Sequence, residues 1–322
     1  MNPMNREVPM TGFELRLRIT GAERQADDIR SLRLRADGGG LLPGYTPGSH
    51  LVLDCAGRRN AYSLTGPAVA PEEYHVSVLL RRSGNGGSAH LHGLDVGSVI
   101  RSSPPRGAFP PVAVARHHLF VAGGIGITPM LAHVREARRW DRSFTLVYAY
   151  RRGRGAHLAE LRALCGDRLS EPRGRAETTA LLGDALSSQP LGTHLYLCGP
   201  ASLVDSVTAA AAAAGWPPQR VHTERFSAAD HAPGKPFTAT IAGSGETVAV
   251  GGDESLLGAL RRAGHSVPSG CEQGVCGECR IGVLAGRPQH RDHYLSPAER
   301  ASGEAVMSCV SRAGDEGLVL DL

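Results

Sequence analysis

Apolar and charged residues alternate near the start of the chain, where Phe13, Leu15, Leu17 and Ile19 are separated by Glu and Arg side chains. This period of two is typical of a β-strand with one buried face. Gly, Pro and Ser turns separate further short apolar runs, which predict strands at residues 32–35, 50–54, 74–80 and 98–101. Several short strands at this spacing predict a closed barrel or a sandwich over residues 1–114.

The middle of the chain changes to alternating strands and helices. Short apolar runs predict strands at residues 119–122, 144–150, 194–198 and 221–226. Helices are expected at 129–139, at 156–164, and from an N-cap at Ser202 through the alanines to Gly215. Strand, turn and helix in repetition predict a parallel sheet with helices on its faces over residues 115–227.

A third region follows a segment of Gly, Pro and small residues, which predicts a linker at 228–236. Strands are expected at 237–242 and 247–250, and a short helix at 255–262. Ser296, Pro297 and Glu299 have the spacing of a capping box with Pro at the first helical position, which predicts a second helix start. Residues 237–322 therefore form a third predicted domain.

Charge differs between these regions. The chain carries 35 basic and 31 acidic residues, but residues 237–322 contain 11 acidic and 7 basic residues, a net charge of −4, whereas the rest has +8. The basic residues are scattered, which argues against a nucleic-acid surface. An acidic third domain favours a docking face for a basic protein partner, with a merely solvated surface as the alternative.

Location follows from the absence of two sequence signals. No apolar run reaches the ~18 residues that a membrane helix needs, and the first residues lack the apolar stretch of a secretory signal. We therefore expect a cytoplasmic protein without a membrane segment.

Four of the seven cysteines gather in the third region. Cys271, Cys276 and Cys279 follow the pattern C-x4-C-x2-C, and Cys309 lies 30 positions after the third, which is the spacing of plant-type 2Fe–2S ferredoxins. Nearby glycines would let the backbone approach the cluster, and Cys309 would close the cage from a distant strand. A zinc site is the alternative, but zinc knuckles are normally built from paired C-x2-C motifs, and only one is present.

Two turns of the middle region follow predicted strands directly. Gly123, Gly124 and Gly126 open a predicted helix, where free N–H groups favour a phosphate, and Cys198-Gly199-Pro200 follows another strand. Ligands of open α/β sheets bind at the edge where the strands end. The alternative for the first turn is a plain strand-to-helix connection, since it is not G-x-G-x-x-G.

Taken together, these motifs resemble the phthalate dioxygenase reductase family, the reductase components of Rieske-type oxygenases. The resemblance rests on Arg59-Asn60-Ala61-Tyr62-Ser63-Leu64, the glycine-rich turn, Cys198-Gly199-Pro200, Glu224-Arg225-Phe226 and the four cysteines, all in the same order. It implies a multidomain chain: an antiparallel β-barrel for flavin, a parallel α/β domain for the nicotinamide nucleotide, and an α+β β-grasp plant-type ferredoxin.

The resemblance also implies site residues. FMN would contact Arg59, Tyr62, Ser63, Leu64, Val78, Leu80, Gly86, Gly87, Ser88, Thr128 and Phe226. NAD(P)H would contact Gly123, Gly124, Ile125, Gly126, Thr128, Pro129, Arg151, Cys198, Gly199 and Pro200. The cluster ligands would be Cys271, Cys276, Cys279 and Cys309. One departure is visible: the family has Arg where this chain has Asn60, so Arg59, Arg81 or Arg82 would bind the flavin phosphate.

The implied function is electron transfer from NAD(P)H through FMN to the 2Fe–2S cluster and on to a terminal oxygenase, by a monomer, with no catalytic residue beyond the cofactors. The resemblance favours NADH. Arg151, Arg152 and Arg154 keep NADPH open, because arginines suit a 2′-phosphate. A stand-alone reductase of small acceptors and a redox-sensing module are the other hypotheses.

Overall fold

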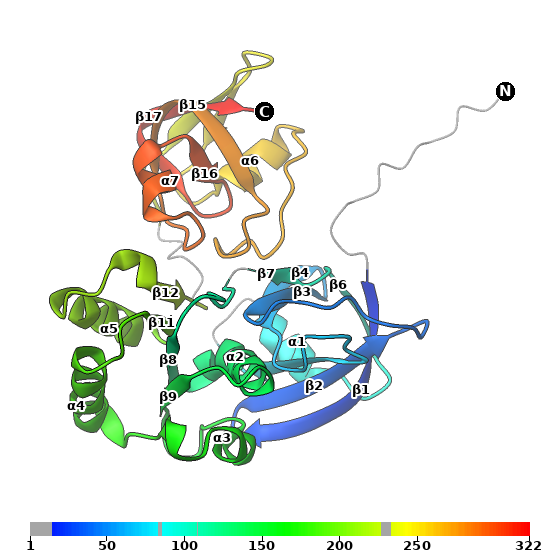
Figure 1. The fold of residues 1–322 in the computed structure, drawn as a ribbon. Coiled ribbons are helices and arrows are strands. Elements are labelled where there is room, and N and C mark those ends of the chain that lie inside the picture. Colours follow the sequence, from blue (N-terminus) through cyan, green and yellow to red (C-terminus); the bar gives the residue numbers. More distant parts are fainter. Residues whose placement is uncertain (1–14, 83–85, 108, 227–232) are drawn as a thin grey trace.

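The computed structural model describes residues 15–82, 86–107, 109–226 and 233–322, and three β-sheets follow one another along them (Figure 1). Phe13, the first residue of the predicted opening strand, and most of the predicted linker lie outside the described residues. The three sheets fall within the three predicted domains, whose boundaries stay predictions.

The first sheet is antiparallel throughout, in the order β4-β3-β6-β1-β2-β5, with β7 paired to β3. A bridge between Leu64 and Val76 joins the chain after β4 to β5 and closes the sheet into a barrel. One helix, α1 (Gly87–Gly93), contacts β3, β4 and β5. The strands are β1 (Leu15–Ala26), β2 (Ile29–Ala36), β3 (Ser49–Cys55), β4 (Arg58–Ser63), β5 (Tyr74–Leu79), β6 (Val99–Ser102) and β7 (Arg106–Gly107).

The alternation in β1 has its expected effect. Leu17 and Ile19 are fully buried in the barrel core, whereas Arg16 and Arg18 face solvent and both pair with Asp37. Strand β4 was not predicted, because its sequence RRNAYS is polar and its side chains are mostly half-buried rather than strictly alternating.

The second sheet is parallel, in the order β10-β9-β8-β11-β12. Its strands are β8 (His117–Gly123), β9 (Phe144–Ala149), β10 (Leu169–Ser170), β11 (Thr193–Cys198) and β12 (Val221–Glu224). Its helices are α2 (Ile127–Arg139), α3 (Leu158–Cys165), α4 (Gly174–Ser187) and α5 (Ala201–Ala213). Three short 3₁₀ turns, η1 (Gly124–Gly126), η2 (Gly166–Arg168) and η3 (Pro218–Arg220), complete it. Helix α4 and strand β10 were not predicted.

The start of α5 differs from its prediction. The helix begins at Ala201, and the carbonyl of Pro200 accepts hydrogen bonds from the N–H groups of Leu203 and Val204. Pro200 occupies the N-cap in an extended conformation, so Ser202 lies inside the first turn and the predicted Ser202 cap is wrong.

The third sheet is mixed, in the order β14-β13-β17-β15-β16, with β13 and β17 parallel. Ser255 caps α6 by accepting from the N–H of Gly258, and Ser296 and Glu299 form the predicted capping box of α7. The elements are β13 (Phe237–Ile241), β14 (Thr247–Val250), α6 (Leu256–Arg262), β15 (Arg280–Gln289), α7 (Pro297–Ser302), β16 (Ala305–Met307) and β17 (Arg312–Asp321).

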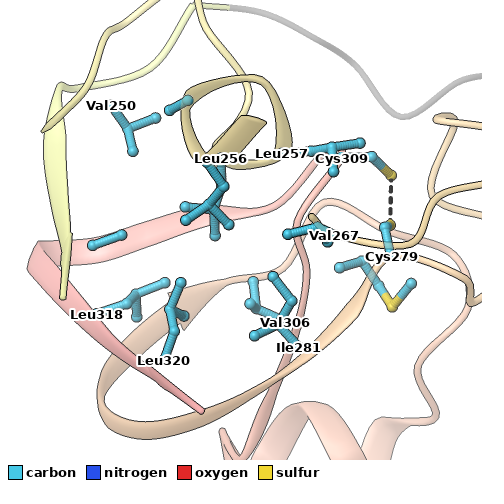
Figure 2. Close-up of a cluster of buried hydrophobic side chains, with 14 of the residues drawn as sticks. Val250, Leu256, Leu257, Val267, Cys279, Ile281, Val306, Cys309, Leu318 and Leu320 are labelled. Carbon is cyan, nitrogen blue, oxygen red and sulfur yellow. Dashed lines mark hydrogen bonds between the residues drawn. The ribbon is translucent and has the colours of Figure 1, made fainter. Parts of the chain in front are cut away.

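The domains join in two different ways. One buried cluster contains Ile29 of the barrel together with Met130 of α2 and Leu161 of α3, so the first two domains share a core. Helices α4 and α5 cover the other face of the parallel sheet. The third domain has a separate core built only from its own residues (Figure 2). No helix in the described part of the chain has the length and apolar character to span a bilayer.

Candidate functional site

The four predicted cluster cysteines are all buried at one end of the third domain. They lie as two pairs. The Sγ atoms of Cys279 and Cys309 are 3.1 Å apart (Figure 2). In the other pair, the N–H of Cys271 donates to Sγ of Cys276 at 3.3 Å. Within the described residues, no three His, Cys, Asp or Glu side chains converge around a point that fits one metal ion. Two thiol pairs suit a cluster of two irons, each held by one pair.

The loop around these cysteines is built for close approach. A Cβ added at Gly270 would lie 2.9 Å from Sγ of Cys276, and Gly274 has a φ of +73°, which favours glycine. The N–H of Gln273 donates to Sγ of Cys271 at 3.3 Å. Cys309 lies in the turn after β16 rather than on a strand, which corrects the prediction. The residues present fit a 2Fe–2S cluster.

The two thiols of the Cys271–Cys276 pair differ in proton affinity. Hydrogen bonds from Cys271, with a contribution from the Arg106 guanidinium, lower the pKa of Cys276, whereas the same pairing and burial raise the pKa of Cys271. A thiolate is the form that binds metal. Arg106 belongs to the barrel, so the charge environment of the Cys276 sulfur depends on a second domain.

A cavity of about 320 Å³ lies where the three domains meet. The barrel contributes His50, Ala61, Ser63 and Gly107, the end of the parallel sheet contributes Thr223, Glu224, Arg225 and Phe226, and the third domain contributes Gln273, Val275, His293, Tyr294, Ser296 and Glu299. Gln273 and Val275 belong to the cysteine loop, so one wall of this cavity is the loop itself.

Three polar atoms in this cavity are buried without a hydrogen-bond partner among the described residues: Nε2 of His50, Oγ of Ser63 and Oε2 of Glu224. Burial of unpaired polar atoms is costly, so a polar ligand in the cavity would satisfy them. Burial raises the pKa of Glu224 to about 8 and, with Arg106 adding to it, lowers the pKa of His50 to about 4. Both side chains are therefore neutral near pH 7, and the protonated Glu224 can donate a hydrogen bond.

Several predicted flavin residues fall into two groups, those that line the cavity and those that pack in the barrel core. Ser63 and Phe226 line the cavity, whereas Leu64 and Val78 are buried in the barrel core and Tyr62 packs against it. Their roles in flavin binding stay predictions. Two other predicted residues lie differently. Thr128 is buried, and its hydroxyl donates to the Ile125 carbonyl. Leu80 is half-buried, and its N–H donates to the Asp28 carbonyl.

The predicted phosphate turn lies at the start of α1. A Cβ at Gly87 would come within 2.6 Å of Oδ1 of Asn60, and one at Gly86 within 3.0 Å of a guanidinium nitrogen of Arg58. Arg59 points elsewhere: its guanidinium donates to the Ser269 carbonyl next to the cysteine loop. Arg58 was not among the predicted phosphate residues, because the polar segment 58–63 shows no strand pattern that would place residues 58, 60 and 62 on one face.

The two nucleotide turns meet as predicted at one edge of the sheet. A Cβ at Gly126 would overlap the Cys198 carbonyl at 2.2 Å, and Gly199 packs directly on the backbone of Gly123. Both turns end neighbouring strands, since Ala122 pairs with Cys198. Their glycines are therefore required for the turns to pack. Arg151 is exposed after β9, and Arg154 forms an ion pair with Asp28 of the barrel at 3.1 Å.

Two family models match the chain. Residues 98–221 match the N-terminal domain of dimethylamine monooxygenase subunit DmmA-like proteins, and residues 239–314 match the 2Fe-2S iron-sulfur cluster binding domain. The second match contains all four cysteines, in agreement with the geometry above.

Curated relatives extend over nearly the whole chain. The heme-dependent oxidative N-demethylase beta subunit of Ectopseudomonas mendocina (strain ymp) is 45% identical over 87% of this chain and 90% of its own. The phenoxybenzoate dioxygenase subunit beta of Ectopseudomonas oleovorans is 37% identical over 95% and 97%. A solved structure of phthalate dioxygenase reductase is 34% identical with a TM-score of 0.75, covering 96% of this chain and 98% of that one.

The chain belongs to the phthalate dioxygenase reductase family. This confirms the resemblance drawn from the motifs and the predicted multidomain fold of antiparallel barrel, parallel α/β sheet and ferredoxin. It also makes the chain an oxidoreductase, with FMN, NAD(H) and a 2Fe–2S cluster as the cofactors of the family fold.

Proposed function

We propose that this chain is the reductase component of an oxygenase system. When bound, FMN would supply the chemistry that connects a two-electron hydride donor, NADH, to one-electron acceptors, the 2Fe–2S cluster and then a terminal oxygenase. The observation that carries the proposal is the shared cavity, because the flavin strand, the end of the nucleotide sheet and the cysteine loop all border it. If the flavin and the cluster worked independently, their sites would not need to border the same cavity.

The residues of this chain bind and orient the cofactors. Ser63, His50 and the neutral Glu224 would hydrogen-bond the flavin ring, and Phe226 would cover it from the nucleotide domain. The start of α1 with Arg58 would bind its phosphate, which takes the role that the family gives to Arg at the position of Asn60. The turns at Gly123–Gly126 and Cys198–Pro200 would hold the nicotinamide nucleotide at the edge of the sheet.

The structure weakens the case for NADPH. Of the three arginines after β9, Arg154 already pairs with Asp28. A carboxylate, Glu171, follows the neighbouring edge strand β10 and accepts a hydrogen bond from the Tyr150 hydroxyl at 2.7 Å. The Arg162 guanidinium also binds both oxygens of Glu171, so this carboxylate adds little to the choice, which rests on Arg154 and on the family. We therefore propose NADH as the donor.

The partner is a terminal oxygenase. A Rieske-type oxygenase follows from the family, and the 45% identity to a subunit of a heme-dependent oxidative N-demethylase supports a heme-dependent oxygenase as a second candidate. The monomeric state, the binding of nucleotide and the cytoplasmic location stay predictions. A stand-alone reductase of small acceptors or a sensing module would not need an oxygenase for turnover.

One experiment separates these functions. The anaerobically purified protein is assayed for NADH oxidation with and without purified Rieske-type and heme-dependent oxygenases and their substrates. We expect oxygenase-dependent substrate conversion with one of them, while a rate that no oxygenase increases contradicts the proposal. Flavin released by heat is identified as FMN or FAD by chromatography, and FAD would contradict the flavin assignment.

The phosphate site has a matched pair of variants. Arg58→Ala lowers flavin retention after gel filtration if Arg58 binds the phosphate, whereas Arg59→Ala keeps it because that guanidinium contacts Ser269. Loss of flavin only in Arg59→Ala would restore the original prediction.

A further inference from the structure

Two arginines of the barrel reach across to the cysteine loop. The guanidinium of Arg59 donates to the Ser269 carbonyl, and Arg106 forms an ion pair with Glu278, which lies between Cys276 and Cys279. Arg106 belongs to β7, and its strand partner is His50, a wall of the cavity where the three domains meet. Arg106 thus links the flavin side of the cavity to the cluster side.

The charged side chain of Arg106 is largely shielded from solvent. The Arg106 side chain is 24% exposed and that of Glu278 is 34% exposed. In the ion pair of Arg16 with Asp37 on the outer surface, the arginine side chain is 70% exposed. Solvent and salt therefore screen the Arg106 charge less than the Arg16 charge. On the cavity side, the Arg106 charge adds to burial in lowering the pKa of His50, its strand partner.

We propose that Arg106 is a positioning residue for electron transfer inside this protein: its ion pair with Glu278 holds the ferredoxin domain against the flavin cavity, and its charge favours the reduced cluster. The inference rests on the cofactors of the proposed function. In this step one electron leaves the flavin and one arrives at the cluster, and no bond forms or breaks at Arg106.

The direction of the effect follows from charge. Reduction adds one negative charge to the cluster, so a fixed cation nearby stabilises the reduced form, and an anion such as Glu278 opposes it. At an effective dielectric constant of about 20, a unit charge about 10 Å from the cluster changes the equilibrium between its oxidised and reduced forms by roughly tenfold. Arg106 and Glu278 therefore have opposite effects on the potential but the same effect on docking.

The opposite effects of Arg106 and Glu278 on the potential provide the test. The midpoint potential of the cluster is measured by a redox titration followed by EPR, and the rate of cluster reduction is measured after rapid mixing with NADH. Arg106→Gln lowers the potential, so that the equilibrium for passing an electron from flavin to cluster becomes roughly tenfold less favourable, and it slows cluster reduction. Glu278→Gln raises the potential yet also slows cluster reduction.

Two further variants serve as controls. Arg106→Lys keeps the charge and restores the potential, whereas the same Arg-to-Gln change at Arg16, whose partner is Asp37 on the outside of the barrel, changes neither readout. If Arg106→Gln does not fold, the electrostatic role is still tested, because Arg106→Lys should leave the potential unchanged and Glu278→Gln should raise it.

The outcomes separate this inference from the proposed function. An intact EPR signal with an unchanged potential in Arg106→Gln or Glu278→Gln overturns the electrostatic role, and an unchanged rate of cluster reduction overturns the docking role. Absence of a 2Fe–2S signal in the wild-type protein overturns the proposed function itself.

Discussion

The two junctions between the domains of this molecule differ in their main contacts: one is hydrophobic and the other is polar. Where the barrel meets the parallel sheet, Ile29, Phe109 and Met130 are buried in one continuous hydrophobic cluster. Where the ferredoxin domain meets the other two, the contacts found here are polar: Arg106 with Glu278, Arg59 with the Ser269 carbonyl, and the shared cavity. The ferredoxin core contains none of the residues of the other domains.

This difference suits the two transfers that the protein performs. Hydride transfer needs nicotinamide and flavin in contact, so a dry, well-packed junction that fixes their geometry is appropriate. The cluster must receive electrons from inside the protein and give them to a partner, and a polar junction can open at a lower cost.

The largest effect is expected at the cluster itself. Cys276→Ser abolishes the 2Fe–2S EPR signal, because one iron loses a ligand, but it leaves NADH oxidation with ferricyanide, since that acceptor takes electrons from the flavin. Cys165→Ser, a buried cysteine of the parallel domain, keeps the signal. Zinc without iron and acid-labile sulfide in the wild-type protein would show that the cluster assignment is wrong.

The dry junction is expected to carry stability. Ile29 is 3% exposed in the shared cluster, so Ile29→Ala leaves a cavity and lowers the free energy of unfolding by about 2–5 kcal/mol. Val96→Ala on the barrel surface, where the side chain is 60% exposed, changes it by less than about 0.5 kcal/mol. Unfolding in urea, followed by flavin fluorescence, measures both. Equal effects of the two substitutions would remove the distinction between the junctions.

Glu224 lies where the two junctions meet and gives stability a pH dependence. Burial raises its pKa from 4.5 to about 8, so the native state holds a proton that the unfolded state has lost between these values. Its stabilisation is complete below about pH 4.5 and is lost as the pH rises to about 8, by at most about 1.4 kcal/mol per pH unit.

Glu224→Gln cannot ionise, so its melting temperature should fall less between pH 5 and pH 8 than that of the wild type. Glu299→Gln, a capping residue whose pKa is lowered by the Ser296 backbone and hydroxyl, has the opposite sign and is a useful comparison. Parallel pH profiles of wild type and Glu224→Gln would mean that Glu224 is ionised in the native protein.

The sequence predicted what depends on neighbours in the chain. The capping box at Ser296, the short helix at 255–262 and the strand at 247–250 were predicted because their signals span a few residues. The four cysteines were found because a loop that wraps a cluster needs a fixed spacing. The meeting of the two glycine turns followed from the rule that parallel strands end at one edge.

What escaped prediction depends on distant residues. Strand β4 is polar and is a strand because β3 pairs along it, and Cys309 is placed by a turn that the spacing does not specify. The partner of Arg59 is 210 positions away, and the partner of Arg106 is in another domain. No periodicity connects such residues, so neither the polar junction nor the position of Arg58 beside Gly86 could be inferred before the fold was known.

The smallest effect is expected from salt, and it falls mainly on the ferredoxin junction. A partly exposed ion pair is worth at most about 1 kcal/mol and is weakened by screening, so cluster reduction after mixing with NADH should slow by about twofold between low and high ionic strength. Reduction of the flavin in the same experiment should change less, because the hydrophobic cluster of the other junction is not screened and only contacts of the Arg154–Asp28 type are. The Glu278→Gln variant lacks the pair and should lose this salt dependence. If its cluster reduction still slows with salt as in the wild type, the ion pair does not hold the ferredoxin domain in place, and the contrast between the two junctions must rest on the cavity instead.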